Sequence, residues 1–302
     1  MTFTRLFLTA VLLTSASTAP AQNSEKPPSA EQLAHRADAA AGPPTATVRF
    51  GPDALRSGEL RLPRGKGPFP VAIVIHGGCW VAEMGGTGMQ GFSEMLRKRG
   101  IATWDIDYRR VGHEGGGWPG TFQDVAAGVD HLPVLAKRYP LDLSRITAVG
   151  HSAGALFSLW AGARGKLDSP WRVRPGAPRL RSVVAIDGPG ALAPMVGVDK
   201  QVCGRPVIVP LMGGTPAERP AEYRIASPSE HLPLGVPQLF VLGELSPFMT
   251  GYIQQARASG DPVKTLSPPG ANHFDIVTAG APNGEAVADW IKANAFSSGI
   301  SD

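Results

Sequence analysis

The sequence predicts an α/β domain whose mostly parallel sheet is covered by helices on both faces. Segments with strand and helix signals alternate along the chain, which is typical of β-α-β units. The strand segments are short, continuous apolar runs such as residues 71–75, as expected where both faces of a sheet are covered. A chain of 302 residues with 43% hydrophobic and 18% charged residues has a globular composition and suits one domain of this size.

The predicted elements follow one another in a regular order. Strands are expected at residues 71–75, 101–108, 146–149, 183–186, 238–242 and 263–266. Helices are expected at residues 91–99, 121–138, 153–163, 248–259 and 285–295. Gly100 is a suitable stop for the first helix, and Thr121 a suitable N-cap for the second. Leu60 and Leu62 indicate an additional edge strand or hairpin before the first buried strand.

The N-terminal residues are typical of an export signal. Arg5 precedes an apolar run at residues 6–13, and Ala19-Pro20-Ala21 has the small-residue pattern of a cleavage site. The run is shorter than the ~20 residues that a membrane-spanning helix needs, so we expect no stable span after cleavage. We therefore expect a periplasmic or extracellular protein that begins near Gln22.

The sequence divides into four parts by composition. Residues 1–21 form the predicted signal peptide, and residues 22–46 are expected to be a flexible leader rich in Ala, Pro, Ser and charge. Residues 47–302 form the predicted domain, in which the Pro- and Gly-rich residues 188–235 are an ordered insertion near the active site.

Charge and cysteine content narrow the possible partners. The formal net charge is +4, and the basic residues form no stripe, which argues against a nucleic acid partner. Two cysteines, Cys79 and Cys203, are too few for a disulfide framework, but an oxidising compartment would allow one bridge between them. The bridge is a hypothesis at this stage.

The main catalytic motif is Gly150-His151-Ser152-Ala153-Gly154. A Gly-x-Ser-x-Gly pattern is weak evidence by itself in a chain with 37 glycines. Here it follows an apolar strand and precedes a helix, which is the setting of a nucleophile elbow. Glycines two residues either side leave room for a sharp turn that holds Ser152 in a strained conformation. A glycine-rich turn without catalysis is the competing interpretation.

A serine hydroxyl needs a base and a site for the negative charge that develops on the substrate. His273 follows the last predicted strand and is our candidate base, with His231 as the alternative. The segment His76-Gly77-Gly78-Cys79-Trp80 follows a buried strand and is the candidate oxyanion loop. We expect oxyanion donors among the backbone N–H groups of Gly77, Gly78, Cys79 and Ala153. Losing one such donor typically costs about 3 kcal/mol in the transition state.

The residue that orients the base is less clearly marked. It is expected after the fifth strand, where Glu244 is the carboxylate in the turn. Asp187, at the end of the fourth strand, is the alternative. A site without an acid in this role is the third possibility. We favour Glu244.

These motifs resemble those of the α/β-hydrolase superfamily, and more closely its bacterial esterase/lipase group with a His-Gly-Gly-x-Trp oxyanion loop. The resemblance extends from about Pro70 to Trp290 and includes the segment Ala271-Asn272-His273-Phe274. Kynurenine formamidase-like enzymes share the loop and the His-Phe ending. The resemblance implies the α/β-hydrolase fold, a Ser–His–acid triad that includes Ser152 and His273, and neither metal nor cofactor.

The sequence therefore predicts a secreted serine hydrolase of the carboxylesterase type. Its expected substrates are small-molecule carboxylic esters with small to medium acyl groups, cleaved through an acyl-enzyme. Trp80 and Trp118 are candidate walls of the substrate pocket. A formamidase or amidase acting on activated amides is the alternative, and a binding protein with impaired catalysis is the alternative from another class. The oligomeric state is not predicted.

Overall fold

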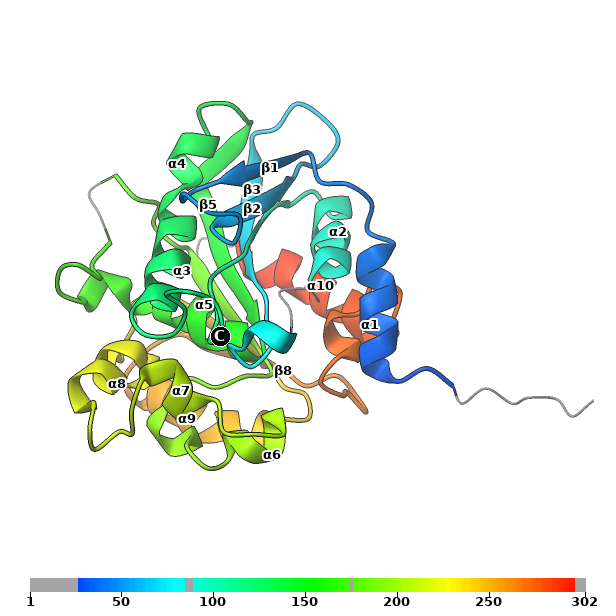
Figure 1. Cartoon of the computed structure of the whole chain (residues 1–302). Helices are drawn as coiled ribbons and strands as arrows, with labels where there is room; N and C mark the ends of the chain where they lie inside the picture. The colour runs from blue at the N-terminus through cyan, green and yellow to red at the C-terminus, as the bar shows by residue number, and fades with distance from the viewer. Residues whose placement is uncertain (1–26, 85–88, 174–175, 297–302) are drawn as a thin grey trace, which may run out of the picture.

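The computed structural model describes residues 27–84, 89–173 and 176–296, and its centre is an eight-stranded sheet (Figure 1). The strand order is β1-β2-β4-β3-β5-β6-β7-β8. The strands are β1 (Ala46–Arg49), β2 (Ser57–Arg61), β3 (Phe69–Ile75), β4 (Ala102–Ile106), β5 (Leu141–His151), β6 (Ser182–Ile186), β7 (Gln238–Val241) and β8 (Val263–Leu266). β1 and β2 pair antiparallel, β2 pairs antiparallel with β4, and the other pairs are parallel. The mostly parallel sheet and the hairpin at Leu60 are confirmed.

The central strands are buried on both faces, as the continuous apolar runs predict. In β3, Val71, Ile73 and Ile75 belong to the hydrophobic cluster on one side of the sheet. Ala72 and Val74 belong to the cluster on the other side. All five side chains are at most 1% exposed. This alternation fixes the register of β3 and, with it, the position of the loop that follows Ile75.

Helices cover both faces of the sheet. α2 (Gln90–Lys98) and α10 (Pro282–Asn294) contribute to the cluster on one face, and α3 (Gly120–Asp130) and α5 (Ala153–Ala163) contribute to the other. α9 (Ser246–Ala258) lies between β7 and β8 in sequence.

The predicted helix at residues 121–138 is interrupted. α3 ends at Asp130, and a short α4 (Leu132–Leu135) follows with a proline in its first turn. Proline has no backbone N–H, so Pro133 begins a new helix more readily than it continues an old one. The expectation that Thr121 caps the helix is wrong. Thr121 lies inside α3, and its hydroxyl donates to the carbonyl oxygen of Arg109.

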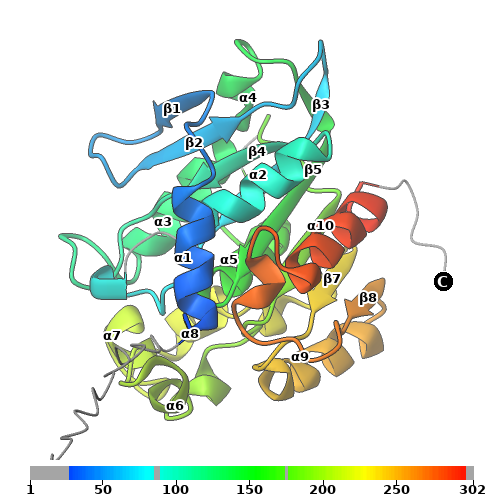
Figure 2. The same cartoon turned by 90° about the vertical axis from the view of Figure 1, so that its right-hand side faces the viewer.

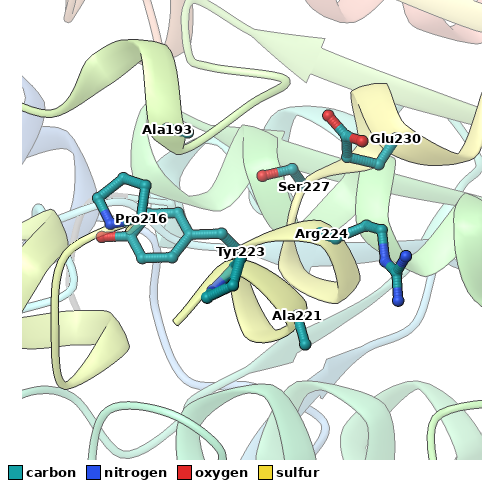
Figure 3. Close-up of a pocket in the computed structure, with 8 residues that line it drawn as sticks. Ala193, Pro216, Ala221, Tyr223, Arg224, Ser227 and Glu230 are labelled. Carbon is teal, nitrogen blue, oxygen red and sulfur yellow. The ribbon is translucent and has the colours of Figure 1, made fainter. Parts of the chain in front are cut away.

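Residues 188–235, the predicted insertion, form short helical elements. The insertion contains three short helices, α6 (Asp199–Cys203), α7 (Ile208–Met212) and α8 (Pro220–Ala226). It also contains two single 3₁₀ turns, η3 (Ala193–Met195) and η4 (Pro228–His231). A cavity of about 500 Å³ lies within it (Figure 3), and every residue that lines this cavity belongs to the insertion.

The leader predicted at residues 22–46 is partly wrong. Residues 30–39 form a helix, α1 (Ala30–Ala39), which begins with a reciprocal capping box between Ser29 and Gln32. α1 packs against α2, and both views show the two helices side by side (Figures 1 and 2). The Asp38 carboxylate accepts the backbone N–H of Gly91, in the first turn of α2, at 2.8 Å. The two helices approach closely at this point, since a Cβ on Gly91 would come within 3.1 Å of the Ala37 backbone.

The predicted signal peptide, residues 1–21, lies outside the described residues. Within the part of the chain that the structure describes, no helix is both long and apolar enough to cross a membrane.

Candidate active site

Ser152 lies on a sharp turn between β5 and α5, as the motif predicts. Its backbone has φ 55° and ψ −122°, a left-handed conformation that few residues other than glycine adopt. A Cβ on Gly150 would collide with the carbonyl oxygen of Gly154, and a Cβ on Gly154 would collide with that of Ile75. The two glycines therefore allow the turn, and Ser152 lies at the N-terminus of α5, where helix dipoles favour negative charge.

A third close approach was not evident from the sequence. A Cβ on Gly188 would collide with the carbonyl oxygen of Ser152, so the chain leaving β6 passes directly behind the nucleophile. Gly188 follows Asp187, and only the pairing of β5 with β6 reveals that it lies behind Ser152.

His273 is oriented by Asp187. Its Nδ1 lies 2.8 Å from Asp187 Oδ2, and the Asp187 side chain is fully buried at the end of β6. Asp187 also accepts the backbone N–H groups of Gly243 and Leu245, each at 2.9 Å from Oδ1. These hydrogen bonds offset the free-energy cost of burying the Asp187 carboxylate away from water. Nδ1 then carries the proton that faces Asp187, and Nε2 is left to accept one.

Glu244, the sequence-based choice of acid, does not occupy this position. Among the described residues, His273 makes its carboxylate contact with Asp187, while Glu244 is exposed and lines the cavity in front of the site. The reason is the path of the backbone. Asp187 has φ 45°, which turns its side chain from the end of β6 toward the His273 loop. The turn at Gly243, which contains Glu244, contributes a backbone N–H group to Asp187 and does not bring the Glu244 carboxylate to His273. His231, the alternative base, bonds to the carbonyl oxygen of Arg224 in the insertion.

The loop after β3 lies against the nucleophile. A Cβ on Gly77 would come within 2.9 Å of Ser152 Cβ. Gly78, Cys79 and Trp80 have positive φ angles of 96°, 49° and 58°, so the backbone turns back on itself next to the serine. Successive residues of this kind point several N–H groups in one direction. Ala153 is the first residue of α5, where backbone N–H groups have no partner inside the helix.

Two sets of contacts hold the oxyanion loop in place. The His76 ring stacks on Tyr108 at 4.3 Å, and the Tyr108 hydroxyl donates to the carbonyl oxygen of His76 at 2.9 Å. His76 Nε2 also lies 3.1 Å from Asp107 Oδ1, which accepts from Arg110 at 2.9 Å. Burial pushes the pKa of Asp107 upward, but its bonds to His76 and the charge of Arg110 hold that pKa below its ordinary value.

A disulfide joins Cys79 to Cys203, so the hypothetical bridge is present. It links the oxyanion loop to α6 of the insertion across 124 residues of sequence. The insertion is therefore attached covalently next to the nucleophile.

His151, the residue before Ser152, supports the loop that carries His273. Its Nε2 lies 2.7 Å from the backbone carbonyl oxygen of His273, so Nε2 carries the proton of this hydrogen bond. The two imidazole rings lie 4.6 Å apart. Burial, together with the neighbouring His273, lowers the pKa of His151 to about 3, so that its imidazole is neutral at ordinary pH.

Ser152 and His273 line one cavity of about 830 Å³. Ser152 Oγ and the His273 ring make no hydrogen bond with each other among the described contacts. Hydrogen bonds between catalytic groups often shorten only when substrate is bound. The other residues that line the cavity are Glu31, Ala34, His35, Gly77, Gly78, Cys79, Glu83, Met84, His151, Gln201, Val202, Glu244, Leu245, Phe248 and Phe274.

Neither tryptophan that we expected at the pocket lines this cavity. Trp80 is 4% exposed and donates from Nε1 to the carbonyl oxygen of Ala153 at 3.2 Å, so it supports the start of α5. Trp118 packs against the rings of Phe122 and Trp171. Apolar walls come instead from Phe248 and Leu245, near the start of α9, and from Phe274.

The fold and this arrangement define the class of the protein. A mostly parallel eight-stranded sheet with a serine on a strand–turn–helix elbow is the α/β-hydrolase fold. The family model BD-FAE matches residues 59–245, more than half of the chain. The chain therefore belongs to the BD-FAE family, an esterase family of the α/β-hydrolase type.

Solved structures agree with this fold. The chain is similar to a bifunctional GH43-CE protein of Bacteroides eggerthii, with a TM-score of 0.66 and 21% identity, covering 82% of this chain and 37% of that one. A truncated carbohydrate esterase from gut microbiota has a TM-score of 0.66 and 20% identity, with coverage of 82% and 94%. Esterase B of Lactobacillus rhamnosis has a TM-score of 0.69 and 17% identity, with coverage of 87% and 90%, and its phosphonate-inhibited form is similarly close. No curated protein sequence matches the chain significantly.

Proposed function

We propose that this protein is an exported serine carboxylesterase that cleaves small-molecule esters through an acyl-enzyme. The observation that carries the proposal is the hydrogen bond between His273 Nδ1 and the buried Asp187, because it leaves Nε2 of a histidine in the Ser152 cavity free to accept a proton. This is the arrangement that a serine nucleophile requires.

The proposed reaction begins when Ser152 Oγ attacks the ester carbonyl carbon and His273 Nε2 takes the hydroxyl proton. The backbone N–H groups of Ala153 and of Gly78 or Cys79 stabilise the oxyanion. His273 then gives its proton to the departing alcohol, which leaves Ser152 acylated. Water attacks the acyl group, His273 takes the water proton, and the acid is released as Ser152 regains its hydrogen.

The cavity and the comparisons support the choice of substrate. A volume of about 830 Å³ admits acyl groups larger than acetyl. The carbohydrate esterase named among the similar structures supports esters of hydroxyl-rich alcohols, and carboxylates such as Glu31 and Glu244 in the cavity can accept hydrogen bonds from hydroxyl groups.

The disulfide supports the export part of the proposal. Disulfides persist in oxidising compartments, so the Cys79–Cys203 bridge agrees with a protein exported through a signal at residues 1–21. N-terminal sequencing of protein recovered from the periplasm or medium should give a start near Gln22. Recovery of an intact Met1 from the cytoplasm alone would contradict export.

Rates on p-nitrophenyl acetate and on N-formylkynurenine test the reaction class. The proposal predicts a higher kcat/KM for the ester and loss of both activities in Ser152→Ala. A higher kcat/KM for N-formylkynurenine would favour a formamidase instead. The alternative from another class, a binding protein with impaired catalysis, is less well supported because His273 has a carboxylate partner in Asp187. A folded protein inactive on all esters would favour that alternative.

A further inference from the structure

The helix α1 reaches the catalytic cavity although it lies outside the residues that match the family model. Glu31, Ala34 and His35, on one face of α1, line the same cavity as Ser152. Figure 2 shows α1 alongside α2. The cavity that would hold the substrate is therefore completed by a segment that precedes β1.

Two contacts fix α1 in this position. Asp38 caps the start of α2 through the Gly91 N–H, and α1 also contacts η5 (Asp275–Val277), which follows His273 closely in sequence. The Ala34 side chain is buried. α1 is thus anchored at its C-terminal end by an interaction that lies outside the cavity.

The charges on the cavity wall all have one sign. Of the described residues that line it, Glu31, Glu83 and Glu244 are acidic, and none is lysine or arginine. Glu83 is paired with Arg205 at 2.9 Å, so its charge is partly compensated. Glu31 has only His35 within ion-pair distance, at 3.8 Å, and Glu244 makes no ion pair among the described residues.

We propose that α1 is part of the substrate-binding site, and that Glu31 together with Glu244 makes the cavity select neutral or cationic esters over anionic ones. This inference rests on the proposed esterase function and adds a substrate class to it. Two unit charges several ångströms apart in a solvated cavity interact weakly, so each glutamate should contribute about a two- to threefold preference.

A pair of esters that differ in charge tests the selection. The probes are methyl 4-acetoxybenzoate, which is neutral, and 4-acetoxybenzoate, which carries one negative charge at neutral pH. The readout is the ratio of kcat/KM for the anionic ester to that for the neutral ester, measured for each variant relative to the wild type, so that intrinsic reactivity cancels. Glu31→Gln and Glu244→Gln should each raise the ratio about two- to threefold at low ionic strength, and the gain should disappear in ~1 M salt.

A matched control removes the same charge elsewhere. Asp168 is fully exposed and does not line the cavity, so Asp168→Asn should leave the ratio unchanged. If Glu31→Gln and Glu244→Gln behave like Asp168→Asn, the charge selection is refuted. If the wild type hydrolyses neither ester, the esterase function itself is contradicted, and the inference fails with it.

A second pair of variants tests the position of α1. Asp38→Asn keeps an oxygen that can accept the Gly91 N–H, whereas Asp38→Ala removes it. Asp38→Ala should raise KM for the neutral ester at least about threefold with kcat little changed, and Asp38→Asn should restore most of the wild-type KM. Equal KM values for Asp38→Ala and the wild type would show that α1 is not a wall of the binding site.

Discussion

The carboxylate of Asp187 lies 2.8 Å from Nδ1 of His273, although 86 residues separate the two in sequence. Asp187 comes from the end of β6 and His273 from the loop after β8, and β7 lies between these strands in the sheet. The parallel arrangement brings both loops to the same edge of the sheet as Ser152. In the proposed mechanism Asp187 holds one tautomer of His273, and the following prediction tests this role.

Asp187→Asn should lower kcat roughly 10³- to 10⁴-fold, because the amide can donate to Nδ1 and so favours the wrong tautomer of His273. Glu244→Gln should keep kcat on a neutral ester within about threefold of the wild type. Steady-state kinetics of both variants, with circular dichroism to confirm folding, check this. A large loss in Glu244→Gln with a small one in Asp187→Asn would reverse the assignment.

Removing the hydrogen bond between His151 Nε2 and the backbone carbonyl oxygen of His273 should impair the proposed base without changing its side chain. His151→Leu should lower kcat at least about tenfold with a smaller change in KM, because the His273 loop loses the contact that holds its backbone carbonyl. His151→Gln can donate from its side-chain amide and should recover part of the rate. Similar kcat values for the Leu and Gln variants would argue against positioning by this bond.

The Cys79–Cys203 disulfide should stabilise both the fold and the oxyanion loop. A bridge that closes 124 residues contributes roughly 3–5 kcal/mol in the chain-entropy model. Cys203→Ser leaves the oxyanion residues themselves intact, yet it should lower Tm and reduce kcat. Differential scanning calorimetry and kinetics of the variant, compared with reduced wild type, provide the measurement. A Tm unaffected by reduction would contradict the prediction.

Asp105 should make stability fall as pH rises. This carboxyl is mostly buried, with 13% of its side chain exposed, and burial raises its pKa to about 8 from an ordinary value near 3.8. Between these two values the unfolded chain has lost the proton that the folded protein still binds, so the unfolded state binds fewer protons and folding stability decreases with pH. Replacing Asp105 with Asn removes this dependence.

The free energy of unfolding of Asp105→Asn relative to wild type should therefore shift in favour of the variant between pH 4 and pH 8. Urea titrations at pH 4, 6 and 8 measure the difference. A difference that is constant over this range would mean that Asp105 ionises normally in the folded protein.

Gly77 should tolerate no side chain. Gly77→Ala places a Cβ 2.9 Å from Ser152 Cβ and 3.0 Å from the His151 carbonyl oxygen, so either the loop or the serine must move. We expect a loss of at least about 100-fold in kcat/KM with a modest change in Tm. Gly165→Ala, which has open space around its Cβ, is the matched control and should retain activity.

The positions of Ser152 and His273, the proposed nucleophile and base, could be predicted from the sequence because their signals are local. Ser152 lies between an apolar strand and a helix, and His273 follows the last strand, so no long-range packing information was needed. The same holds for the ends of α5 and β8, which match the expected residue ranges.

The acid and the cavity walls could not be predicted because they depend on backbone direction. Asp187 and Glu244 both follow buried strands, and the sequence shows neither the positive φ of Asp187 nor the backbone N–H groups of Gly243 and Leu245 that hold its carboxylate. Trp80 adjoins the oxyanion loop in sequence, yet its indole turns inward to the Ala153 carbonyl oxygen.

Helix α1 could not be predicted for a different reason. Its Ala-rich, charged sequence has no clear apolar face, a composition that also suits a flexible leader. The capping box of Ser29 and Gln32 was the available signal.

The most direct test of the proposed triad is the site of covalent labelling by a fluorophosphonate, located by peptide mass spectrometry. We expect a single adduct on Ser152 of the wild type, no adduct in Ser152→Ala, and strongly slowed labelling in Asp187→Asn. Labelling of folded Ser152→Ala at the wild-type rate, or no labelling of the folded wild type, would contradict the proposed triad.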